Sequence, residues 1–169
     1  AVKHPDWLFC PEKGADMSEK IKQIDIHNLA NWLYRKVCTT SPGGDYVIDN
    51  LVEFMKIYKV DGYSFDGYYL PPTICYCEYC SKLYKKETGR ELPEKQDMNS
   101  IAYRVYNIWA CDKLEDWHRK LSVRLKELNP EAALYTWSIN AGRYGQLLTS
   151  PRGMSSRMNL IYDAATMEW

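Results

Sequence analysis

The sequence predicts an α/β fold with a parallel sheet, and three features lead to that expectation. A short apolar run at 60–65 reads as a strand buried on both faces, and a second run at 132–138 reads as another strand. A long helical pattern of apolar residues lies between them and ends near Leu128. Strands that alternate with helices along a chain are typical of a parallel sheet covered by those helices.

The first forty residues predict little regular structure apart from one strand. The stretch 4–10 is apolar and opens with a proline, which indicates a strand or its exit loop. Residues 11–25 are polar and read as an exposed loop. A strand is expected at 34–38, directly before the first clear helix.

Ser41 followed by Pro42 is typical of a helix start, because serine caps the first turn and proline suits its first position. The helix is expected to run to Tyr58 with its apolar residues on one face. The strand 60–65 then follows, so 34–65 predicts a right-handed β–α–β unit. The remaining predicted elements are helices at 78–88 and 100–128 and strands at 132–138 and 159–163.

This order gives three or four βα units in 169 residues. A complete (β/α)8 barrel typically needs ~250 residues. We therefore expect 1–169 to be a single partial domain, part of a (β/α)8 (TIM) barrel with outer helices and a fragment of a longer catalytic domain. The alternative is a complete small doubly wound domain, although no glycine-rich nucleotide-binding loop supports it.

Charge and hydropathy exclude some classes of function. The 22 basic and 22 acidic residues balance, which argues against a nucleic-acid or membrane-surface role. No apolar run approaches the ~20 residues of a membrane span. The chain begins at Ala1 without a signal segment and ends at Trp169, so the fragment interpretation leaves a cytoplasmic or a secreted location open. Homo-oligomers through regions outside this chain stay open too.

Three cysteines fall within six positions, at Cys75, Cys77 and Cys80. Zinc bound by thiolates needs ligands this close, usually with a fourth ligand from elsewhere in the chain. Iron–sulfur clusters usually use wider spacing. The alternative is three unrelated buried cysteines. Because disulfide pairing would leave one of the three unpaired, the pattern predicts a metal site rather than a disulfide framework.

Asp66 stands at the carboxyl end of the strand at 60–65. In α/β folds this edge of the sheet is where chemistry is done, so Asp66 is a catalytic candidate, and a structural carboxylate bonded to loop amides is the alternative. Near the amino terminus, His4 and Trp7 are candidates to line a sugar site, because indole faces suit the apolar faces of sugar rings; loop packing is the alternative.

The segment 36–42, Lys-Val-Cys-Thr-Thr-Ser-Pro, resembles the Cys-x-x-Ser-Pro turn of zinc-containing β-galactosidases with a barrel catalytic domain. That resemblance implies Cys38 as the fourth ligand beside the cysteine triplet, and it gives Asp66 the place of the acid/base residue. The family's Asn-Glu pair is replaced here by Phe65-Asp66, followed by Gly67.

Phe-Asp-Gly resembles instead the strand end of the α-L-fucosidase-like hydrolases, whose aspartate there is the nucleophile. Together with the cysteine triplet, the segment 87–93 and the opening His-Pro-Asp-Trp at 4–7, it makes the chain look most like a set of bacterial proteins called hypothetical glycosyl hydrolases. The resemblance implies a carbohydrate substrate, galactoside-like or fucoside-like.

Glycoside hydrolysis needs two carboxyl groups across the scissile bond. We expect Asp66 to be the nucleophile of a retaining glycosidase and Glu168, just past a late strand, to be its partner. Asp163 is a second candidate, and the partner could also lie beyond this chain. Four cysteines leave no open position on zinc, so the metal is expected to be structural. The candidate sugar contacts are His4, Trp7, Tyr68, Trp137, Asn140 and Arg143.

Two rival classes remain open at this point. One is a non-catalytic carbohydrate-binding or scaffold barrel that keeps the zinc site, because one fold serves many functions. The other is a zinc-dependent interaction module, which would expose apolar surface around the cysteines. The sequence leaves the sugar, the linkage and the stereochemical outcome undetermined.

Overall fold

The computed structural model describes residues 3–25, 28, 31, 34–66, 74–139 and 164–168. The chain divides into two compact units, and each is described by itself: unit 1 holds Ala1–Asp45 and Thr73–Tyr106, and unit 2 holds Tyr46–Pro72 and Asn107–Trp169. No described helix is both long and apolar enough to cross a membrane.

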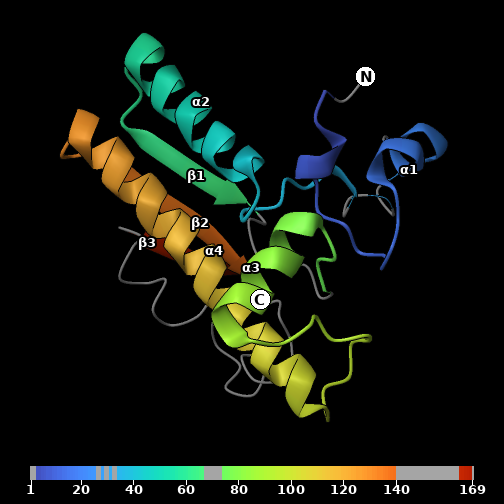
Figure 1. The fold of residues 1–169 in the computed structure, drawn as a ribbon. Coiled ribbons are helices and arrows are strands. Elements are labelled where there is room, and N and C mark those ends of the chain that lie inside the picture. The colour runs from blue at the N-terminus through green and yellow to red at the C-terminus, as the bar shows by residue number, and fades with distance from the viewer. Residues whose placement is uncertain are drawn as a thin grey trace. The chain divides into compact units, whose positions relative to one another are not determined.

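The described elements are η1 (Pro5–Trp7), α1 (Met17–Gln23), α2 (Pro42–Tyr58), β1 (Gly62–Asp66), α3 (Glu78–Thr88), α4 (Ile101–Leu128), β2 (Ala133–Ile139) and β3 (Ala164–Glu168) (Figure 1).

The strands of unit 2 form a parallel sheet in the order β1-β2-β3. The register pairs Gly62 with Ala133 and ends with Asp66 beside Trp137. Glycine is needed at the first of these positions, because a Cβ on Gly62 would lie 2.0 Å from the carbonyl oxygen of Ala133. Parallel strands need a long crossover connection, and here the chain between β1 and β2 contains α3 and α4.

One face of this sheet is buried against α2 and α4, which run alongside β1 and β2 in Figure 1. Tyr63 and Phe65 alternate along β1 and pack on the core, while Ser64 between them is exposed. The Tyr63 hydroxyl donates a hydrogen bond to the carbonyl of Leu51 at 2.5 Å, which ties strand to helix. The buried core residues are Ile48, Val52, Met55, Trp117, Leu121, Leu125, Ala132 and Leu134.

The prediction of a (β/α)8 barrel fragment is wrong. The described strands form one three-stranded sheet, and segment 34–38, expected as a further parallel strand, is not one. Within it, only Val37 forms a bridge, which is isolated and antiparallel to Leu8. Backbone hydrogen bonds from the Phe9 amide to the Lys36 carbonyl and from the Cys38 amide to the Trp7 carbonyl hold this short antiparallel pairing within unit 1.

Local sequence signals located the helices better than the strand expected at 34–38. The helices predicted to end at Tyr58 and to span 78–88 are confirmed as α2 and α3. The exposed loop predicted for 11–25 is wrong in part, because it contains α1, whose first turn is capped by the Asp16 carboxylate accepting from the Ser18 amide at 2.8 Å. The strand predicted at 159–163 lies outside the described residues, and β3 begins at Ala164.

Candidate metal centre

The loop that carries Cys38 is fixed by the start of α2. The Ser41 hydroxyl donates to the Cys38 carbonyl at 2.7 Å and accepts from the Gly43 amide at 3.2 Å. This one hydroxyl therefore closes the turn that follows Cys38 and also caps the first turn of α2. A Cβ on Gly44 would lie 2.5 Å from the Thr39 carbonyl oxygen. Glycine therefore lets the first turn of the helix pack directly against the 38–40 loop.

The other three cysteines surround the start of α3. Cys77 is its N-cap, and the Cys77 sulfur accepts a hydrogen bond from the amide of Cys80 at 3.4 Å. The helix ends at Gly89 in the left-handed conformation, with φ of 69°. Because Cys80 lies one turn inside the helix, its sulfur returns to the same side as that of Cys77.

The four sulfurs of Cys38, Cys75, Cys77 and Cys80 all lie within 4.8 Å of one another, and all four side chains are buried. The Cys38 sulfur is 3.4 Å from Cys80, 3.6 Å from Cys77 and 3.8 Å from Cys75. None of them forms a disulfide. A tetrahedral zinc ion with Zn–S bonds of ~2.3 Å requires sulfur–sulfur separations of ~3.8 Å. The four cysteines are therefore close enough to bind a metal ion.

Hydrogen-bond donors surround this cluster and would offset the negative charge of bound thiolates. The Cys10 amide donates to the Cys75 sulfur at 3.5 Å, in addition to the Cys80 amide on Cys77. The Thr40 hydroxyl oxygen lies 3.1 Å from both the Cys38 and the Cys80 sulfurs. Such contacts to the ligand atoms orient them and tune a metal site.

The protonation of the cluster reflects its crowding. Hydrogen bonds from the thiols of Cys75, Cys77 and Cys80 lower the pKa of Cys38 well below its usual range. Burial raises the pKa of Cys75, and the hydrogen bond with Cys38 raises that of Cys80. A bound cation would favour the thiolate forms of these buried groups.

A tyrosine network holds the segment that carries Cys75. The Cys75 amide donates to the Tyr106 hydroxyl at 2.8 Å, and the Tyr76 amide donates to the Cys10 carbonyl at 2.7 Å. Burial raises the pKa of Tyr106 well above its usual range, so its hydroxyl stays protonated. The Tyr84 ring packs edge-on against Tyr106, with centroids 5.7 Å apart. These contacts fix the ligand backbone before any metal binds.

The predicted catalytic and sugar-binding positions are described unevenly. For Asp66, Trp137 and Glu168 the structure describes the backbone. Asp66 ends β1 and pairs with Trp137 of β2. Glu168 ends β3 and pairs with Ile139, two residues further along β2 than Trp137. Parallel strands end at one edge of the sheet, so Asp66 and Glu168 share its carboxyl edge. Tyr68, Asn140 and Arg143 lie outside the described residues.

The predicted sugar contacts near the amino terminus lie in unit 1. The rings of His4 and Trp7 stack on each other, with centroids 3.9 Å apart and planes 7° apart. One face of the indole is therefore covered by imidazole, which leaves at most the opposite face for a sugar ring. The role of these two residues as sugar contacts stays a prediction.

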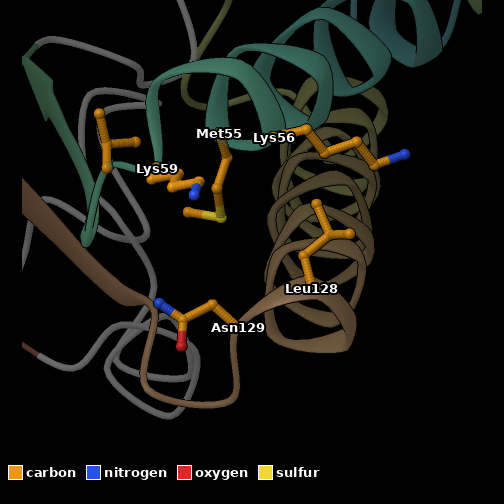
Figure 2. Close-up of a pocket in the computed structure, with 6 residues that line it drawn as sticks. Met55, Lys56, Lys59, Leu128 and Asn129 are labelled. Carbon is orange, nitrogen blue, oxygen red and sulfur yellow. The ribbon is translucent and has the colours of Figure 1, made fainter.

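Unit 2 has a pocket of about 250 Å³ at the amino ends of β1 and β2 (Figure 2). Met55 and Lys59 extend toward it, and the Lys56 ammonium points away. The Asn129 side-chain oxygen accepts from the Glu131 amide at 3.1 Å, which closes the turn between α4 and β2. This pocket lies at the sheet edge opposite Asp66, so it takes no part in the predicted chemistry.

Sequence reasoning missed Thr40 and Cys10, which contact the ligand sulfurs without being ligands themselves. Thr40 stands in the Cys-Thr-Thr-Ser-Pro turn, where the signal available was only its nearness to Cys38. Cys10 is 65 residues from Cys75, and no local pattern links the two. Comparisons with models of protein families, with curated proteins and with solved structures find no match to this chain.

Replacing Thr40 with valine should weaken metal binding about tenfold while the fold is retained, because the change removes a polar contact to two sulfurs at nearly constant volume. The measurement is competition for zinc with a chromophoric chelator. The matched control is Thr39→Val, one residue earlier in the same loop. Equal affinities for the two variants would contradict a role of the Thr40 hydroxyl in the site.

Proposed function

We propose that the four cysteines bind one structural zinc ion. The observation that carries this is the set of buried sulfurs within 4.8 Å of one another, contributed by two segments that are distant in the sequence. Thiolates are soft ligands and favour zinc over hard cations such as magnesium or calcium. Four protein ligands fill the tetrahedral shell, so no position is left for a reactive water. The ion would join the 38–40 loop to the start of α3.

Purified protein should contain one zinc ion per chain, and its removal by a chelator should expose thiols and lower the thermal stability of unit 1. Structural zinc contributes roughly 10–16 kcal/mol in small zinc domains, so loss of one ligand of four should weaken binding by at least ~100-fold. Cys38→Ser tests this by metal analysis and thiol titration. The control is Cys111→Ser, since Cys111 lies in α4 and is not one of the four clustered cysteines. Protein that purifies in a folded state without bound metal would overturn the proposal.

We further propose that the chain acts on carbohydrate as a glycoside hydrolase, with Asp66 as nucleophile and Glu168 as acid/base. The support is the sheet register: both residues end parallel strands at one edge, and their ladder positions belong to the same face. With strands ~4.8 Å apart and ~3.3 Å per residue, their Cα atoms are separated by roughly 12 Å. A Cα separation of this size is compatible with the carboxyl spacing of glycosidases, ~5–9.5 Å.

The resemblance of Phe65-Asp66-Gly67 to the fucosidase-like strand end favours the nucleophile role for Asp66. The rival function is a non-catalytic carbohydrate-binding protein that retains the zinc site. Both functions would use the carboxyl edge of the sheet, and they differ in whether Asp66 and Glu168 take part in a reaction. Activity therefore separates them, and binding alone does not.

A panel of aryl glycosides that includes galactosides and fucosides should reveal one hydrolysed sugar, and Asp66→Asn should lower its kcat/KM by ~1000-fold or more, since a nucleophile is lost. The control is Asp61→Asn, an exposed carboxylate at the opposite end of the same strand. Hydrolysis that survives in Asp66→Asn would discard the site. Sugar binding without hydrolysis in zinc-loaded protein would favour the rival function.

A further inference from the structure

A second pocket in unit 1 opens beside the cysteine cluster. It has a volume of about 350 Å³, and Cys77 is the one cysteine of the four that lines it among the described residues. The Cys77 side chain is 6% exposed, compared with 4%, 2% and 3% for Cys38, Cys75 and Cys80. The pocket therefore reaches the ligand that is nearest to solvent.

The lining of this pocket is acidic. It includes the residues Asp6, Asp16 and Glu78 and no lysine, arginine or histidine among the described residues. These groups come from η1, the N-cap of α1 and the first residue of α3, so three separate elements each place a negative charge at the same opening. Ser18 and Tyr76 also line the pocket.

The contacts of these carboxylates leave most of their charge in place. Asp6 accepts from the Tyr79 hydroxyl at 3.2 Å, and Asp16 accepts from the amide and hydroxyl of Ser18. Both donors are neutral. Glu78 forms an ion pair with Lys82 at 2.5 Å, but both side chains are largely exposed, so solvent screens that pair. The residues that line the pocket therefore carry a net negative charge.

We infer that this acidic pocket is the route by which a divalent metal cation enters and leaves the four-cysteine site. A hydrated cation is attracted to the carboxylates, and the volume holds it with several water ligands. At Cys77 it exchanges those waters for thiolate sulfur, and the thiol protons pass to solvent. The inference rests on the proposed zinc site. It adds an entry path for the metal and the acidic residues that set the rate of metal association.

The first test measures association and release of Co²⁺, whose bond to thiolate gives a charge-transfer band. The triple variant Asp6→Asn, Asp16→Asn, Glu78→Gln keeps the shapes of the side chains, and asparagine remains a good helix cap. At low ionic strength its association rate should fall about tenfold, and the difference should shrink as salt is added. The release rate to a chelator should change little, because the ligands are intact.

The matched control is Glu87→Gln, Glu91→Gln, Glu94→Gln, which removes the same charge from exposed positions of unit 1 that do not line the pocket. It should leave association close to that of the parent chain. If both triple variants slow association equally, only the total charge matters and the route is wrong.

The second test blocks the pocket without changing charge. Ala15→Phe places a ring in its wall, and Ala102→Phe, at an exposed position in α4, is the control. If the pocket is the path, Ala15→Phe slows association and release by the same factor and leaves Kd unchanged. Rates equal to those of the control would overturn the route.

The outcomes separate this inference from the zinc proposal. A parent chain that gives no cobalt–thiolate band contradicts the metal site itself. A strong band with rates that respond neither to the pocket carboxylates nor to the ring at Ala15 leaves the site in place and rejects the route.

Discussion

Four buried cysteines have their sulfurs within 4.8 Å of one another, and this cluster is the constraint on which unit 1 depends. Their sulfurs are 3.4–3.8 Å from that of Cys38, which is too far for disulfides and right for a shared tetrahedral ion. The Ser41 cap, the Thr40 hydroxyl and the Tyr106 hydrogen bond all act on the segments that carry these sulfurs. Burial raises the pKa of the Cys75 thiol, so a bound cation would favour its thiolate form.

The proposed chemistry lies in the other unit and follows from a different constraint. A parallel sheet ends all of its strands at one edge, so residues far apart in the chain arrive there together. Asp66 and Glu168 reach that edge through a register that Gly62 makes possible, since any side chain there would strike the Ala133 carbonyl. The proposed zinc site then stabilises a unit whose residues 73–106 belong to the crossover between β1 and β2.

Sequence alone predicted what depends on neighbouring residues. Ser41-Pro42 and Gly89 marked helix ends correctly because capping is a local hydrogen-bonding problem. The strand at 34–38 and the barrel were wrong because pairing depends on a distant partner, here Leu8 in an antiparallel bridge. The cysteine triplet was visible from spacing, whereas Cys38 entered through a resemblance. The contact of Cys10 with the cluster is tertiary and left no trace in the local pattern.

The most direct measurement is X-ray absorption at the zinc edge of protein purified with its metal. The account predicts a single shell of four sulfur atoms at ~2.3 Å from zinc, with no nitrogen or oxygen neighbour in that shell. Such a shell would establish that Cys38 and the triplet bind one ion together. A mixed shell with oxygen or nitrogen, or a loosely bound ion with mostly water ligands, would contradict the four-cysteine structural site.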